Sequence, residues 1–332
     1  MKERQRTMMK PRPIAAVALA AVLLAGCGAS PGGGGADTPA APAAGPAGGG
    51  EVSVANCGDT YAYSTPPARV VTSSTVATEV MLALGLKDRM AGTVAAKDIM
   101  PEYAPDLAGI KVVAESAFPP PSKEVVYSVN PDLVVSGYPD DYGPKALGDR
   151  AQLRKDGVNT YLLSGSCPGH RAKVDDTYTD LRELGKIFKV EAKAGQLAAA
   201  LKAEVDAVVP RDPAVRVFDY AGGKEKPQTS GSAALSGDLF ERAGGKDIFP
   251  EVTRFGQVSW EEVVKRDPEV IVVEDQVFEP AGKSIAWMRS YGPIRDVTAV
   301  KENRFVVVPV NDLQPGLRSG RALKTLAEGF AR

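Results

Sequence analysis

The sequence contains few histidines and cysteines, the residues that many metal and redox sites require. Its 332 residues include one histidine, His170, and three cysteines. A single imidazole excludes His-rich zinc and manganese cages and HExxH proteases, which need two or three histidine ligands. The sequence also contains no CxxC pair, GxSxG elbow or GxGxxG loop, so the common motifs of thiol redox enzymes, hydrolases and dinucleotide-binding enzymes are missing.

The chain also has no excess of basic residues, with 40 Lys+Arg against 41 Asp+Glu. This balance argues against nucleic acid as a partner, since a nucleic-acid binder needs a basic face. The apolar run Ile14–Ala25 has 12 residues, whereas a membrane-spanning helix needs about 20. A hydrophobic content of 44% with 24% charged residues is typical of a globular chain with one large domain or two smaller ones.

The N-terminus has the pattern of a secretory signal. Residues 2–12 are basic, the apolar run follows, and the run ends in Leu24-Ala25-Gly26-Cys27. Small residues before a cysteine match the lipobox of bacterial lipoproteins, so we expect residues 1–26 to be a signal peptide and Cys27 to carry a diacylglyceryl group. The alternative is a plain signal peptide followed by an accidental cysteine.

A stretch poor in large apolar residues follows. Gly28–Gly50 contains 9 Gly, 7 Ala and 4 Pro in 23 residues, too little apolar surface to fold. We therefore predict residues 27–51 to be a disordered linker that tethers an exported domain to the outer face of the cell membrane through lipid on Cys27. Cysteines outside the cytoplasm tend to pair. This favours a Cys57–Cys167 disulfide, with two free buried thiols as the alternative.

Beyond the linker, short β-branched runs alternate with helical stretches such as Ala77–Leu84 and Gly237–Ala243. This alternation predicts an α/β fold with mainly parallel sheets covered by helices. The expected strands are Arg69–Thr72, Met90–Val94, Asp132–Val135, Thr160–Leu163, Val215–Tyr220, Val270–Val273 and Phe305–Pro309.

One sequence unit occurs twice. Ser122-x-Glu124 leads to Pro131 and a buried strand, and Ser259-x-Glu261 leads to Pro268 and another, at a constant offset of 137 residues. Upstream of each lies a second matching helical segment, offset by 159 residues. Each unit reads as a short helix with an N-capping serine, a stop near proline and a strand. Two copies in the same order predict two similar Rossmann-like lobes.

Between the copies, the sequence is helical by period from Asp175 to Val209, with a break expected at Lys189-Val190. An uninterrupted helix over Glu191–Val209 would be about 28 Å long, which suits a spine between two domains, although a helix packed within one lobe is the alternative. We expect an N-terminal lobe over 52–173, a helical region with one long linking helix over 174–210, and a C-terminal lobe over 211–332.

These features together resemble the solute-binding lipoproteins of iron-siderophore, haem and cobalamin ABC importers, which have two α/β lobes, a long linking helix and a cleft. The resemblance extends from about Cys57 to the end. It rests on Arg69-Val-Val, on Glu79 through Arg89, on both Ser-x-Glu units and on the closing helix Arg318–Arg332. Asn56-Cys57-Gly58 and Ser166-Cys167-Pro168 resemble the actinobacterial-type branch, which favours the disulfide.

The resemblance implies roles for individual residues. Glu124 and Glu261 match the glutamates, one per lobe, that dock onto permease arginines in the cobalamin-binding member. The alternative is that these acids merely suit the helix dipole. Phe118 and Phe255 match tryptophans that face its ligand.

Ligands of parallel sheets collect beyond the carboxyl ends of the strands. That rule nominates Tyr138, Tyr220, Asp275 and Asn311, and Arg254 suits an anionic chelate. His170 is more typical of an exposed loop residue than of an iron or haem ligand. In a preformed chelate the organic ligand already coordinates the metal, so the protein needs no metal ligands of its own. We therefore expect no protein metal site and no covalent cofactor. The expected bound ligand is a ferric siderophore or another metal chelate.

The expected function is therefore that of a monomeric substrate-binding lipoprotein of an ABC importer. It would capture an iron-siderophore or a related chelate or tetrapyrrole and deliver it to a permease dimer. The alternatives are an exported hydrolase that uses cleft carboxylates and a surface lipoprotein without a transport role.

Overall fold

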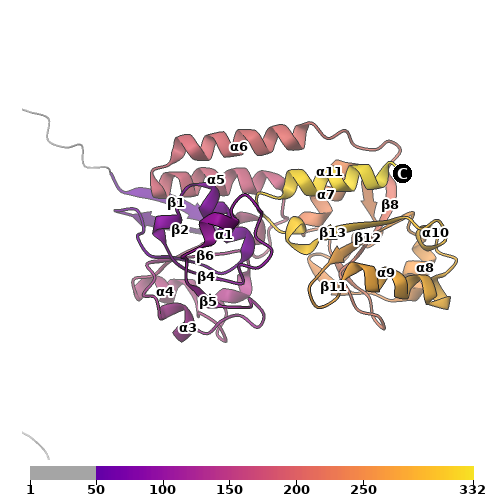
Figure 1. Ribbon diagram of the computed structural model, residues 1–332, viewed down its shortest axis with the longest axis horizontal. Helices are drawn as coiled ribbons and strands as arrows, with labels where there is room; N and C mark the ends of the chain where they lie inside the picture. The colour runs from indigo at the N-terminus through magenta and orange to yellow at the C-terminus, as the bar shows by residue number, and fades with distance from the viewer. Residues whose placement is uncertain (1–49) are drawn as a thin grey trace, which may run out of the picture. The chain divides into compact units, whose positions relative to one another are not determined.

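The computed structural model describes residues 50–332 (Figure 1). The predicted signal peptide, the lipidation site Cys27 and nearly all of the predicted linker lie outside the described residues. The predicted α/β class is confirmed, because two separate parallel sheets are each accompanied by helices.

The first sheet, which defines the N-terminal lobe, has five parallel strands in the order β5-β4-β3-β6-β7. All three residues of β3 are buried, as expected for a central strand covered on both faces. The strands are β3 Val70–Thr72, β4 Met90–Val94, β5 Val112–Ala114, β6 Leu133–Ser136 and β7 Asn159–Leu162; the helices are α1 Thr75–Ala83, α2 Ala104–Leu107, α3 Lys123–Tyr127 and α4 Arg150–Lys155.

The second sheet, which defines the C-terminal lobe, has four parallel strands in the order β10-β8-β12-β13. Its central strands β8 and β12 are almost entirely buried. The strands are β8 Val215–Tyr220, β10 Gly245–Asp247, β12 Val270–Asp275 and β13 Phe305–Pro309; the helices are α7 Leu235–Ala243, α8 Trp260–Arg266, α9 Ala281–Ser290, α10 Thr298–Lys301 and α11 Ser319–Phe330.

Two antiparallel ribbons were not predicted. β1 (Val52–Asn56) pairs with β2 (Asp59–Tyr63), and β9 (Gln228–Ser230) pairs with β11 (Phe255–Gln257). A two-stranded ribbon is marginal by itself and depends on what it packs against, so its short segments carry little sequence signal. The predicted disulfide is present in the structure: Cys57, in the turn between β1 and β2, bonds to Cys167 with a Cα–Cα distance of 5.2 Å.

The duplicated unit folds twice into the same local structure. Arg69 Nε donates to the carbonyl of Asn130 at 2.9 Å, and Arg216 Nε donates to that of Asp267 at 2.9 Å. Asn130 and Asp267 occupy equivalent repeat positions, and both have left-handed backbones with φ of 47° and 41°. Of the two predicted serine caps, Ser259 accepts a hydrogen bond from the amide of Glu262, whereas Ser122 occupies the N-cap position without such a bond.

Two helices, rather than one, connect the hydrophobic cores of the lobes. α5 (Val174–Phe188) and α6 (Glu191–Asp206) pack side by side, and α6 also contacts α11 (Figure 1). The first residues of α5 lie in the C-terminal core and its later residues in the N-terminal core, while α6 begins in the N-terminal core and ends in the C-terminal one. The predicted linking helix therefore bridges both cores, but it ends at Asp206 instead of Val209.

None of the helices in residues 50–332 is both long enough and apolar enough to span a membrane.

Candidate functional site

The strand orders place one topological switch point in each sheet. In the N-terminal lobe the chain first extends the sheet from β3 to β4 and β5, then returns to add β6 on the other side of β3. In the C-terminal lobe β10 and β12 flank β8 in the same manner. Crevices for ligands form beyond the carboxyl ends of strands at such points. The loops after β3 and β6, and those after β8 and β12, therefore define the candidate site.

Phe118 and Tyr138 meet at this edge of the N-terminal lobe. Their rings pack edge to face with centroids 4.8 Å apart, and the Phe118 side chain is 59% exposed. Burial, followed by the charge of Asp141, raises the pKa of the Tyr138 hydroxyl to about 12. The phenol thus stays protonated near neutral pH and acts as a hydrogen-bond donor or an apolar ring.

Close to Tyr138 lies Asp141, a buried carboxyl that sequence reasoning missed. Its Oδ2 accepts hydrogen bonds from the hydroxyls of Ser73 and Ser136, each at 2.5 Å. Ser73 follows β3 and Ser136 ends β6, so the contacts join the two strands at the switch point. Burial raises the pKa of Asp141 against the lowering effect of the two hydroxyls. We assign Asp141 to the support of this edge.

In the C-terminal lobe, the nominated residues differ in exposure. Phe255, on β11, is 62% exposed. Tyr220 is fully buried and donates its hydroxyl to Glu279 Oε1 at 2.9 Å. Asp275 is exposed, and its Oδ1 accepts the amide of Ala281 at the start of α9 at 2.8 Å. Phe255 thus faces solvent, whereas Tyr220 and Asp275 hold neighbouring loops in place.

Arg254 and Asn311 connect the lobes. One Arg254 nitrogen, Nη2, donates to the backbone carbonyls of Cys167 and His170 at 2.8 and 2.7 Å. Asn311 follows β13, and its amide donates to Asp98 Oδ2 at 3.1 Å, beyond the end of β4. The carboxyl ends of both sheets are therefore turned toward each other, with part of the Arg254 guanidinium already engaged by backbone.

A buried ionic cluster also crosses between the lobes, and no sequence pattern predicted it. Arg318, just before α11, donates from Nε to Glu79 Oε2 of α1 at 2.9 Å. Its Nη1 reaches Asp98 at 3.1 Å and Asp312 at 3.2 Å. Arg318, Glu79 and Asp312 are all buried, so the charges compensate one another out of contact with water.

The two repeat-related glutamates are both exposed. Hydrogen bonding from Ser122 lowers the pKa of Glu124, and hydrogen bonding from its own backbone amide, then from Ser259, lowers the pKa of Glu261. Each side chain therefore remains a carboxylate well below neutral pH. Each lies in the first turn of a short helix in its own lobe, Glu124 on α3 and Glu261 on α8.

His170 forms a contact with a carboxylate and belongs to no group of metal-binding side chains among residues 50–332. Its Nε2 is 2.8 Å from Asp176 Oδ2, and the imidazole is partly exposed. Among residues 50–332, no group of three or more His, Cys, Asp and Glu side chains is arranged to hold a metal ion.

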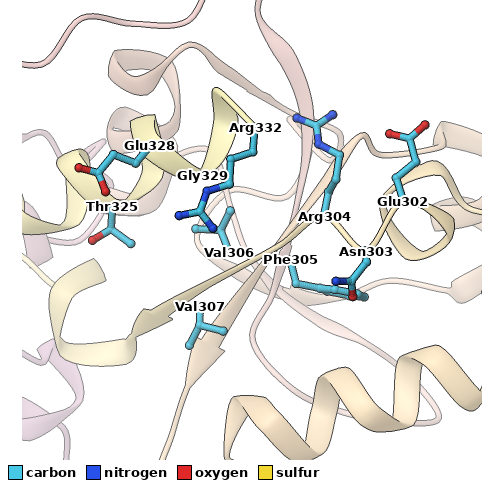
Figure 2. Close-up of a pocket in the computed structure, with 10 residues that line it drawn as sticks. All are labelled: Glu302, Asn303, Arg304, Phe305, Val306, Val307, Thr325, Glu328, Gly329 and Arg332. Atoms are coloured by element: carbon cyan, nitrogen blue, oxygen red, sulfur yellow. The ribbon is translucent and has the colours of Figure 1, made fainter.

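A cavity of about 560 Å³ lies at the opposite edge of the C-terminal sheet, between β13 and α11 (Figure 2). Glu302, Asn303 and Arg304, which precede β13, line one end of it, and Glu328 and Arg332 of the C-terminal segment line the other. The cavity lies at the amino end of β13, and both acidic and basic side chains line it. Its volume alone does not make it the ligand site, since the sheet rule points to the other edge.

Curated relatives match most of the chain. The chain is 26% identical over 271 residues to a cobalamin-binding protein of Halobacterium salinarum, and the match covers 80% of this chain and 69% of that protein. It is 26% identical over 266 residues to the uncharacterized ABC transporter substrate-binding lipoprotein YvrC of Bacillus subtilis, covering 77% of this chain and 76% of that protein.

Solved structures show the same fold. A periplasmic binding protein from Veillonella parvula superposes with a TM-score of 0.74 at 27% identity, covering 84% of this chain and 97% of that one. An ABC-type Fe3+-hydroxamate transport system protein from Saccharomonospora viridis has a TM-score of 0.71 at 23% identity, covering 85% and 99%. The periplasmic binding protein family model matches residues 70–311. The chain therefore belongs to the periplasmic binding protein family, the solute-binding proteins of ABC importers, and is not an enzyme.

Proposed function

We propose that this protein captures a metal chelate, a ferric siderophore or a related tetrapyrrole, between its two lobes and delivers it to an ABC permease. The observation that carries the proposal is the placement of exposed aromatic rings on facing sheet edges. Phe118 beside Tyr138 borders the N-terminal edge, and Phe255 borders the C-terminal one. Aromatic side chains supply large apolar contact areas for an organic ligand.

The donor set supports a chelate over a free metal ion. A bare cation requires several protein ligands, and the described residues offer no such cluster. His170 is occupied by Asp176. The protonated Tyr138 phenol offers a hydrogen-bond donor and an apolar ring at this edge. A chelate brings its own donor atoms, so the protein needs only shape, apolar contact and hydrogen bonds.

For delivery, we propose that Glu124 and Glu261 dock onto the permease dimer, one from each lobe. Their exposure and their equivalent places in the repeat support this role, since exposed charges set register and encounter rate. We further propose that the protein works as a monomer, exported and anchored to the outer face of the cell membrane by lipid on Cys27, with residues 27–51 as its tether.

Ligand titration tests the proposal. The purified protein is titrated with ferrioxamine B, haemin and cyanocobalamin while tryptophan fluorescence is followed. Trp260 is a sensitive reporter because it stacks on Tyr220, 5.9 Å between ring centroids, next to the C-terminal switch point. We expect saturable binding of one class, weakened about tenfold or more by Phe255→Ala or Tyr138→Ala. Binding of none of these chelates, with a bare metal ion bound instead, would contradict the proposal.

A further inference from the structure

Two large apolar side chains are exposed in the loop between β12 and α9. Val277 is 92% exposed and Phe278 is 84% exposed. The strand-end rule nominated Asp275 and Gln276, which precede these two residues, but neither Val277 nor Phe278. Exposed apolar surface contributes nothing to folding, and when it gathers at one place it marks an interaction site.

The loop is held firmly on both sides of these residues. Glu279 accepts hydrogen bonds from the Tyr220 hydroxyl at 2.9 Å and from the Gly223 amide at 3.2 Å. Before the apolar pair, the Gln276 amide donates to the carbonyl of Ala221 at 3.0 Å. These contacts tie the loop to the segment after β8. The exposure of Val277 and Phe278 is therefore part of the fold and not the result of a frayed end.

The loop occupies the switch point of the C-terminal sheet, where the connections after β8 and β12 diverge. Next to it, β13 leads to Asn311, which contacts Asp98 of the other lobe. Figure 1 shows β11, the strand that carries Phe255, on the side of this lobe that faces the N-terminal lobe. Val277 and Phe278 therefore lie at the edge that borders the candidate site.

The other phenylalanines strengthen this assignment. The chain has nine, and three of them are exposed: Phe118, Phe255 and Phe278. All three lie on loops or ribbon strands at the facing sheet edges, one in the N-terminal lobe and two in the C-terminal lobe. Phenylalanines exposed by chance would be scattered over the surface. One apolar ligand bound between the sheet edges would instead contact all three rings.

We propose that Val277 and Phe278 form a third apolar contact for the cargo, and that the cargo is a chelate with an extended apolar face, such as a macrocycle, instead of a chelate with a hydrophilic outer surface. This inference rests on the proposed function. It adds two specificity-determining residues, and it selects among chelates: three apolar contacts reward a ligand that buries apolar surface against each of them.

The test uses a dye as well as candidate ligands, so that it does not depend on the identity of the cargo. The probes are 1-anilinonaphthalene-8-sulfonate, haemin, cyanocobalamin and ferrioxamine B. The variant is Val277→Ser/Phe278→Ser, and the matched control is Val209→Ser, which alters another side chain that is 83% exposed, after α6. Urea unfolding of the variant checks that it folds like the wild type.

We expect the dye to bind the wild type and the control, a macrocycle to displace it, and the double variant to bind both probes about tenfold or more weakly. Unchanged dye and macrocycle binding in the double variant would overturn the inference while leaving the proposed function intact. Tightest binding of ferrioxamine B, unaffected by the variant, would overturn the substrate class.

Two further outcomes separate the alternatives. Wild-type chelate affinity in the double variant, combined with lost uptake in cells, would assign the loop to the permease and contradict the inference. Dye binding through the loop with no bound chelate at all would contradict the inference and the proposed function together.

Discussion

At the scale of single residues, the burial of certain carboxyl groups is the feature that the sequence pattern does not predict. Asp180 on α5 is fully buried, and its Oδ1 accepts hydrogen bonds from the hydroxyls of Tyr161 at 2.8 Å and Ser164 at 2.5 Å. Burial raises its pKa to about 7 in spite of these donors. The repeat and the strand pattern give no hint of it, because an aspartate on a helix is normally placed in solvent.

Asp180 should therefore make stability depend on pH. The unfolded chain releases this proton near pH 4, whereas the native state keeps it up to about pH 7. The native state thus binds more protons in this window, and the free energy of unfolding falls as pH rises from about 4 to 7. For Asp180→Asn we expect a flatter dependence in urea unfolding at pH 4.5 and 7.0. An unchanged slope, matching that of the exposed control Asp88→Asn, would contradict this.

At the scale of elements, the β1–β2 ribbon depends on attachments that a propensity argument does not see. Its turn is bonded to the segment after β7 through Cys57–Cys167. The neighbouring Asn56 side chain both donates to the carbonyl of Leu162 at 2.8 Å and accepts its amide at 2.9 Å. A ribbon of two short strands is held in place by such contacts and not by its own hydrogen bonds.

Removing the disulfide should destabilise the fold. Its loop spans 110 residues, and the chain-entropy model gives about 4.7 kcal/mol for a loop near this size, with measured losses of about 2–5 kcal/mol. We expect Cys57→Ser/Cys167→Ser to lower the free energy of unfolding by an amount in that range in urea titrations. A reductant should produce the same loss in the wild type and no further loss in the variant. Equal stability with and without reductant in the wild type would rule the contribution out.

At the scale of the whole molecule, the lobes share buried charge as well as helices. Replacing Arg318 with methionine leaves Glu79 buried without its partner, which costs about 3–5 kcal/mol. We expect Arg318→Met to lower the free energy of unfolding by that amount, and Glu79→Leu/Arg318→Met to recover part of it. The exposed control Arg182→Met should change little. Urea unfolding followed by circular dichroism measures all three, and a loss below about 1 kcal/mol for Arg318→Met would contradict the argument.

The docking proposal also belongs to this scale, because it needs both lobes at once. Glu124→Ala/Glu261→Ala should leave chelate affinity unchanged and abolish uptake in cells, since the residues lie on helices outside the candidate site. Glu302→Ala/Glu328→Ala removes the same charge from exposed positions at the other edge of the C-terminal sheet and should keep uptake intact. Weakened chelate binding in the first variant would remove both glutamates from the docking role.

The sequence by itself determined the alternating α/β elements, the seven strands of the two sheets that it named, and the duplication, because strand burial and Pro- or Gly-terminated helices leave local patterns. The strand-end rule nominated Tyr138, and the family resemblance nominated Phe118 and Phe255. The tertiary structure alone decided that Tyr220 is buried, that Arg254 is engaged by backbone, and that Arg318 meets Glu79 across 239 residues of sequence. Which side chains meet between lobes depends on how distant segments pack, and one chain's local periodicity carries no record of that packing.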